Sequence, residues 1–173
     1  MSIRYIKKGK SSLEKNIEEE KVSETVQNIL KEIEVSGDKA VRNLSQKFDN
    51  YDPKEFKLSD SDIKEIISKV SEKDMEDIKF AQSQVVNFAK IQRDSMKDVE
   101  VETMPGVILG HKNIPVQSVG CYVPGGKFPM VASAHMSIAT ASVAGVPRIV
   151  GSTPPFNGEP NPAVIAAMHL GGA

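Results

Sequence analysis

The charged residues of this chain are crowded into its first hundred positions. Residues 1–100 hold 19 of the 22 Lys and Arg residues and 21 of the 23 Asp and Glu residues, in a chain of 173. A highly charged segment is typical of amphipathic helices with one solvated face, whereas a charge-poor segment is typical of strands and helices buried on more than one side. The distribution therefore predicts two parts: a helical N-terminal segment, residues 1–97, and a more buried part, residues 98–173.

The first part is predicted to form four helices, the last ending near Arg93, because its apolar residues recur at intervals of three and four. The first helix is expected to stop at Ser36-Gly37, after which Asp38 is the expected N-cap of the second. Capping boxes are expected to open the third and fourth helices, in the pairs Ser59 with Asp62 and Ser71 with Asp74. The first helix is also expected to have one apolar face shielded from water (a dry face), made of Leu13, Ile17, Val26, Ile29, Leu30 and Ile33.

After Asp98 the pattern changes to short apolar runs. Val99–Thr103 and Val107–Leu109 are expected to pair as a hairpin. The remaining elements are predicted strands at Val116–Val123 and Arg148–Val150, a helix over Val131–Ala144 between them, and a last helix over Ala163–Leu170 capped by Asn161. Two strands joined through a helix run parallel. The predicted fold class is α/β, in which the helical N-terminal segment is followed by an incomplete parallel β-α-β-α unit.

A β-α-β-α series covers a parallel sheet only when further strands follow it. The glycine pair Gly171-Gly172, directly after the last predicted helix, is the usual lead-in to another strand. We therefore expect the chain to be the N-terminal portion of a longer protein.

The turn Gly120–Lys127 is the strongest candidate for a binding site. It follows a predicted strand and precedes a predicted helix, and its Pro-Gly-Gly sequence lets a ligand come close to bare backbone amides. A tight turn that binds nothing explains the same residues, since a short glycine-rich turn is a weak motif. Gly125 and Gly126 are the candidate contacts of this turn.

Other classes of function find little support. A net charge of −1 and the lack of a basic stripe argue against nucleic-acid and membrane partners. A single cysteine, Cys121, and an N-terminus without a signal-peptide core point to the cytoplasm. Neither a Walker A loop nor a G-x-G-x-x-G fingerprint is present. His111, His135 and His169 are too far apart to suggest a zinc site built from this chain alone.

Several segments together resemble the histidinol dehydrogenase family. They are Val116-Gln-Ser-Val-Gly-Cys-Tyr-Val-Pro-Gly-Gly126, Met136 in the following helix, Ala144-Gly145 at its end, Ser152-Thr-Pro-Pro155, the run Gly37–Asp49 and the run Val101–Val107. The resemblance covers the chain from about Glu24 onward, and its Tyr-Val-Pro-Gly-Gly signature is specific.

The resemblance implies an NAD-dependent, zinc-requiring dehydrogenase that oxidises a primary alcohol, a small molecule, through an aldehyde to a carboxylic acid. It also implies that residues 98–173 are the start of an incomplete Rossmann-like nucleotide-binding domain, and that the full-length protein is a homodimer. Tyr122 falls on the family's NAD-contacting tyrosine, and Gly125 and Gly126 on the turn beside it. The family's zinc ligands and proton-transfer residues fall beyond residue 173, so no catalytic or metal residue is placed in this chain, which we expect to be inactive alone.

The segment Lys127–Ser137 departs from the histidinol-oxidising members and looks closer to the branch that includes sulfopropanediol dehydrogenases. A lysine at this corner suits an anionic group, although an exposed turn lysine is the commoner case. The substrate is therefore either L-histidinol or a related polyol such as sulfopropanediol. The alternative to an enzyme is a non-catalytic nucleotide-binding or dimerisation module.

Overall fold

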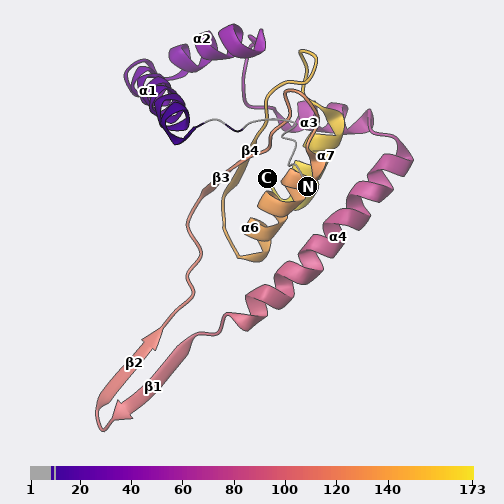
Figure 1. The fold of residues 1–173 in the computed structure, drawn as a ribbon. Coiled ribbons are helices and arrows are strands. Elements are labelled where there is room, and N and C mark those ends of the chain that lie inside the picture. The colour runs from indigo at the N-terminus through magenta and orange to yellow at the C-terminus, as the bar shows by residue number, and fades with distance from the viewer. Residues whose placement is uncertain (1–8, 10) are drawn as a thin grey trace, which may run out of the picture. The chain divides into compact units, whose positions relative to one another are not determined.

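A computed structural model of the chain describes Gly9 and residues 11–173. The chain forms two compact units, Met1–Asp52 and Pro53–Ala173 (Figure 1). In the part that the structure describes, no helix is both long and apolar enough to cross a bilayer.

The first unit contains two helices, α1 (Ser12–Ser36) and α2 (Asp38–Asp49). The predicted stop at Ser36-Gly37 is confirmed, because α1 ends at Ser36. The prediction that Asp38 caps α2 is wrong: Gly37 is the N-cap, and Asp38 is the first residue of the helix. Gly37 has a φ of 55°, a left-handed conformation that glycine adopts without strain, so the chain turns one residue earlier than expected. Asp38 still suits its position, since a carboxylate in the first turn interacts favourably with the helix dipole.

The predicted dry face of α1 is largely exposed. Leu13 is 70% exposed and Leu30 is 59% exposed, while Ile29 and Ile33 are half-buried. The period of the helix was predicted correctly, but burial also requires a surface to pack against. The described part of this unit offers only α2, which covers a small part of the stripe.

The second unit begins with α3 (Asp60–Ser68) and α4 (Glu72–Ser95). The capping box at α3 is confirmed: the Asp62 amide donates to Ser59 Oγ at 3.2 Å, and the Ser59 amide donates to Asp62 Oδ2 at 2.9 Å. Hydrogen bonds from Ser59 also lower the pKa of the Asp62 carboxyl. At α4 the cap is one-sided, since the Asp74 amide donates to Ser71 Oγ at 3.1 Å and the Asp74 carboxylate accepts from the Ser71 hydroxyl instead of the backbone.

The predicted hairpin is confirmed as β1 (Val99–Met104) paired antiparallel with β2 (Val107–His111). Val101 lies opposite Leu109 on one face, while Glu100 and Glu102 lie on the other. Every residue of both strands is exposed, and Figure 1 shows the hairpin projecting away from the rest of this unit beyond the end of α4.

The predicted parallel pair is also confirmed. It is formed by β3 (Val119–Tyr122) and β4 (Ile149–Ser152), with Val119 opposite Ile149. β3 is shorter than the predicted Val116–Val123, whereas β4 begins one residue later than the predicted Arg148–Val150 and extends to Ser152. They are joined through one helical stretch made of α5 (Val131–Ala134), the π-helical turn η1 (His135–Ala139) and α6 (Thr140–Val143). The predicted end at Gly145 is confirmed, with a φ of 85°, whereas nothing in the apolar period indicated the π-helical turn.

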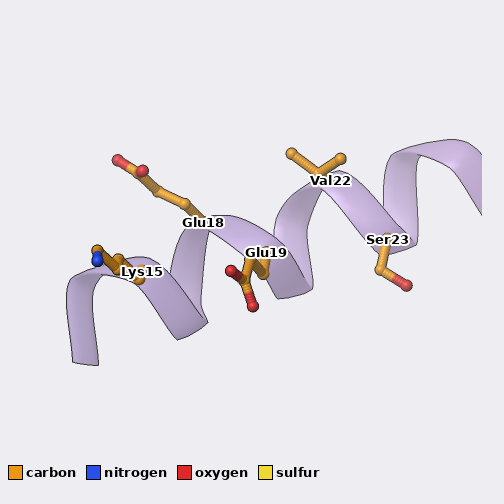
Figure 2. Close-up of a pocket in the computed structure, with 5 residues that line it drawn as sticks. All are labelled: Lys15, Glu18, Glu19, Val22 and Ser23. Carbon is orange, nitrogen blue, oxygen red and sulfur yellow. The ribbon is translucent and has the colours of Figure 1, made fainter. Parts of the chain in front are cut away.

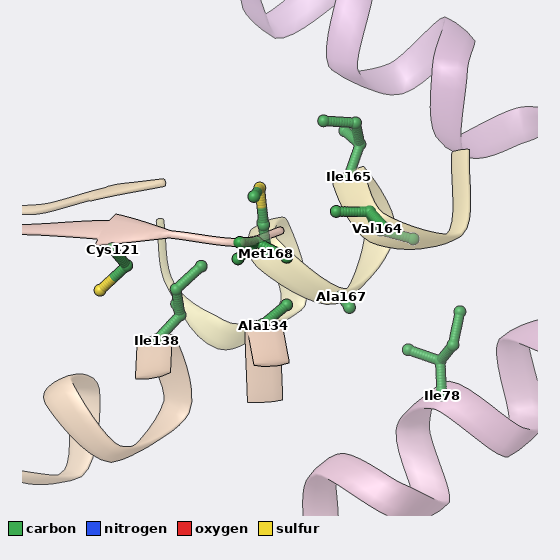
Figure 3. Packing of buried hydrophobic residues seen from close by; sticks show 10 residues of the cluster. Ile78, Cys121, Ala134, Ile138, Val164, Ile165, Ala167 and Met168 are labelled. Carbon is green, nitrogen blue, oxygen red and sulfur yellow. The ribbon is translucent and has the colours of Figure 1, made fainter. Parts of the chain in front are cut away.

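The last helix, α7 (Pro162–Gly171), lies at the centre of the core (Figure 3). Its predicted cap is confirmed, because the Val164 amide donates to Asn161 Oδ1 at 3.1 Å. The helix contacts α3, α4, α5 and η1. Its buried residues face the sheet through Cys121 and the connecting helix through Ala134 and Ile138. Burying a Val or Ile side chain of this kind contributes roughly 1.5–3 kcal/mol.

The packing of α7 joins α3 and α4 to the strands in one unit. The structure thus confirms a mixed helix and strand fold with a small parallel sheet. The boundary at residues 97 and 98, which concerns the domains of the full-length protein, stays a prediction.

The close approach of α7 to the connecting helix yields a stability prediction. A Cβ on Gly171 would lie 2.9 Å from Ile138 Cγ2, so Gly171→Ala should force the two helices apart and destabilise the fold by about 1–3 kcal/mol. Gly120→Ala is the matched control, because a Cβ there meets nothing within 4 Å. Chemical denaturation of the two variants gives the comparison. Equal midpoints for both variants would contradict the packing described.

Candidate functional site

The candidate site is the corner where β3 ends. The strand leads into Val123-Pro124-Gly125-Gly126, and the Val123 amide donates to the Ser152 carbonyl at the end of β4 at 2.8 Å. This hydrogen bond extends the parallel pairing by one residue and holds the two loops after the strands beside each other. In open parallel sheets, ligands bind outside the carboxyl ends of the strands, where these loops lie.

The two glycines of the turn differ in their surroundings. Gly125 is buried, and a Cβ on it would lie 2.9 Å from Thr153 Oγ1 and 3.7 Å from the Pro154 carbonyl oxygen. Gly126 is exposed, and a Cβ on it would meet only Pro154 Cγ, at 3.9 Å. Close packing therefore requires glycine at 125, whereas at 126 the structure leaves room for a side chain and presents bare backbone to solvent.

Tyr122 is the last residue of β3 and is 65% exposed. Alternate residues of a strand point to opposite faces of the sheet. On one face, Cys121 is buried in the core; on the other, Tyr122 and Val150 are exposed. The tyrosine ring is therefore available at the carboxyl end of the strand, and the expectation that Cys121 is a small buried hydrophobe is confirmed.

A polar contact joins three helical segments, α4, η1 and α7. His135, in η1, is only 3% exposed. The Gln82 side chain, from α4, donates from Nε2 to the Ala167 carbonyl of α7 at 3.1 Å, and the same nitrogen lies 3.3 Å from His135 Nδ1. This burial agrees with the expectation that His135 is a structural histidine.

The Ala167 carbonyl fixes the protonation state of His135. Turning the Gln82 amide over would bring its oxygen against that carbonyl, so the amide nitrogen must face both partners, and it is a donor only. His135 Nδ1 must then accept, which places the ring proton of the neutral imidazole on Nε2. Burial, which disfavours the charged form, lowers the pKa of His135 in the same direction.

Neither the hollow along α1 nor the described titratable side chains form a second candidate site. The hollow drawn in Figure 2 runs along one face of α1 and is lined by Lys15, Glu18, Glu19, Val22 and Ser23, all from that single helix. Within Gly9 and residues 11–173, no three His, Cys, Asp or Glu side chains come together as a metal site would require. The described residues therefore do not fit a zinc ion.

Comparison with known proteins shows the family. The histidinol dehydrogenase family model matches residues 13–173. The chain belongs to the histidinol dehydrogenase family. The crystal structure of histidinol dehydrogenase from Elizabethkingia anophelis superposes with a TM-score of 0.80 at 27% identity, over 98% of this chain and 36% of that one.

Curated relatives in the histidinol dehydrogenase family carry more than one name. A histidinol dehydrogenase homolog of Shouchella clausii is 56% identical over 98% of the chain, and a sulfopropanediol 3-dehydrogenase of Ruegeria pomeroyi is 43% identical over 100% of it. A histidinol dehydrogenase of Methanocaldococcus jannaschii is 36% identical over 88% of the chain. The chain spans 40% of the first of these relatives, 39% of the second and 36% of the third.

Membership of this family places the chain among dehydrogenases. The proposed roles of Tyr122, Gly125 and Gly126 in binding NAD stay predictions. The structure brings these three residues to one corner with Thr153, which the sequence placed only in a loop. Its position directly after the second parallel strand was the available signal. The Gln82 contact had no such signal, because its partners are 53 and 85 residues away.

The buried His135 gives a prediction for the dependence of stability on pH. Its pKa is lowered from 6.5 in the folded protein, so below about pH 6.5 the unfolded chain takes up a proton that the folded chain resists. The free energy of unfolding should therefore fall as the pH drops below this value, by at most about 1.4 kcal/mol per pH unit from this group. Above it the contribution should be constant.

Urea denaturation at pH 7.5 and at pH 5.5 measures the effect. His135→Gln removes the titrating group and should flatten that part of the profile, while His169→Gln, at an exposed position of α7, should leave it in place. If His135→Gln keeps the full acid sensitivity of the parent, the buried imidazole is not its source.

Proposed function

We propose that this chain supplies the N-terminal part of an NAD-dependent, zinc-requiring alcohol dehydrogenase that acts in the cytoplasm as a homodimer. The proposed reaction takes a primary alcohol through an aldehyde to a carboxylic acid in two oxidations, with NAD as the hydride acceptor. One observation carries the proposal: in a chain of the histidinol dehydrogenase family, an exposed tyrosine and a bare glycine turn meet at the carboxyl ends of two parallel strands.

The residues at this corner fit a dinucleotide. The Tyr122 ring, 65% exposed, offers an apolar face for a ribose or base and a hydroxyl that can remain hydrogen-bonded. The exposed backbone at Gly126 allows an anionic group to approach without meeting a side chain. We propose that Tyr122, Gly125 and Gly126 contact NAD, and that the zinc ligands and the proton-transfer residues come from outside residues 1–173.

The substrate is proposed from the pattern of identity. The chain shares 43% identity with the sulfopropanediol 3-dehydrogenase and 36% with the histidinol dehydrogenase of Methanocaldococcus jannaschii. Lys127 is exposed beside the turn, so its charge is available to an anionic group, and its Nζ lies 5.9 Å from the centre of the Phe128 ring. We therefore propose that the substrate is a polyol such as sulfopropanediol, in preference to L-histidinol.

An activity assay on the full-length protein tests the function. NADH formation is followed with sulfopropanediol and with L-histidinol, before and after zinc is removed by a chelator and restored. The expected result is zinc-dependent oxidation with a higher kcat/KM for sulfopropanediol. A full-length protein that binds NAD and yet oxidises neither alcohol would favour a non-catalytic nucleotide-binding module.

The 173-residue chain alone should show no dehydrogenase activity and hold no stoichiometric zinc. A catalytic zinc takes three protein ligands, and the described residues bring no such group together. Elemental analysis after chelator washing measures the metal, with the full-length protein as the positive control. Tightly held zinc at one ion per chain would contradict this prediction.

Tyr122→Ala in the full-length protein should raise the KM for NAD while leaving the fold intact. Loss of one partly exposed ring contact removes about 1–2 kcal/mol of binding, or roughly 5- to 30-fold. Tyr122→Phe, which keeps the ring, is the matched control and should lie closer to the parent. If Tyr122→Ala unfolds, or binds NAD as tightly as the parent, the ring is a packing residue instead.

A further inference from the structure

We infer that the hydroxyl of Thr153 is a further contact for NAD, donating a hydrogen bond to a ribose or phosphate oxygen of the dinucleotide. This inference rests on the proposed function, since it places the residue at the proposed NAD corner. Thr153 directly follows β4, as the proposed turn follows β3, and the hydrogen bond between the Val123 amide and the Ser152 carbonyl holds the two loops together.

The position of the hydroxyl is set by the turn opposite. Thr153 Oγ1 lies 2.9 Å from the point that a Cβ on Gly125 would occupy, closer than Cβ atoms come to a neighbouring heavy atom in proteins. The hydroxyl therefore fills the space beside the bare backbone of Gly125. The Thr153 hydroxyl can occupy this position only because residue 125 has no side chain.

The hydroxyl has unused hydrogen-bonding capacity. A threonine hydroxyl can donate once and accept twice. Among the described residues its hydrogen bond is to the carbonyl oxygen of Pro154, the next residue, at 3.5 Å, well beyond the usual 2.7–2.8 Å for this kind of bond. Thr153 is half-buried, so a closer acceptor for its hydroxyl would add a favourable hydrogen bond.

The acceptor that suits this place is an oxygen of the ligand proposed for the same corner. Ligands of parallel sheets bind outside the carboxyl ends of the strands, and Thr153 follows one such end while Tyr122 lies at the other. Tyr122 would contact the dinucleotide through its ring, and the glycine turn would contact it through backbone amides. Thr153 would donate a directed hydrogen bond to it. The competing explanation is that the hydroxyl only fills space against Gly125.

Two substitutions in the full-length protein separate these explanations. Thr153→Val keeps the shape and removes the hydroxyl, and Thr153→Ser keeps the hydroxyl and removes a methyl group. The hydrogen-bond explanation expects Thr153→Val to raise both the Kd and the KM for NAD by about 3- to 10-fold, with kcat changed less than twofold. Thr153→Ser should stay within twofold of the parent in all three quantities.

A steric cycle with Gly125 gives a second readout. Gly125→Ala alone should weaken NAD binding, because its methyl group collides with the threonine hydroxyl. Adding Thr153→Ala relieves that collision, and the double variant should bind NAD as weakly as Thr153→Ala alone. Recovery of the double variant to the parent affinity would show that the hydroxyl only fills space, and would overturn the inference.

The outcomes also distinguish this inference from the proposed function. Calorimetry that detects no NAD binding to the parent full-length protein contradicts the proposed function. A parent that binds NAD, together with a Thr153→Val variant that binds it equally well, contradicts the Thr153 inference alone. If Thr153→Val does not fold, as judged by its thermal transition, the comparison of Thr153→Ser with Thr153→Ala decides: equal affinities overturn the inference, and a 3- to 10-fold weaker Thr153→Ala supports it.

Discussion

The packing of α7 is the interaction on which the second unit depends. Val164 and Ala166–Ala167 are fully buried, and Ile165 and Met168 nearly so, which makes this helix apolar on almost every side. A helix of that kind has to be surrounded, and α3, α4 and the helix between the strands surround it. Among the described residues the parallel sheet has two strands, β3 and β4, too few for independent stability. Its covered face is therefore stabilised by packing against the same core.

The packing of this core determines the geometry of the candidate site. The side chains of Val119 and Cys121 anchor one face of β3, which leaves Tyr122 directed to the open face by alternation alone. The register with β4 then fixes which residues of the two loops meet. A change in the core that moved β3 along β4 by one residue would bury Tyr122 and remove the corner.

Local patterns accounted for most of the fold that could be predicted from the sequence. The capping box at Ser59, the cap at Asn161 and the switch from helical to strand periodicity each depend on residues within a few positions of one another, so the sequence displays them directly. The exposed stripe of α1 shows the limit of this method, because a period indicates which face is apolar and not whether anything covers it. The contact of Gly125 with Thr153, and that of Gln82 with His135, join distant positions and follow from strand register and helix packing.

The β1–β2 hairpin has a practical consequence for handling the protein. Its strands pair only with each other among the described residues, so each retains an outer edge of unpaired backbone groups. Glu100 and Glu102 place negative charge along β1, whereas β2 runs Val-Ile-Leu-Gly-His with no acidic residue. Uncharged apolar edges of this kind template strand-to-strand association between molecules. We therefore expect aggregation of this chain in concentrated preparations to begin at the edge of β2, and Ile108→Lys to reduce it.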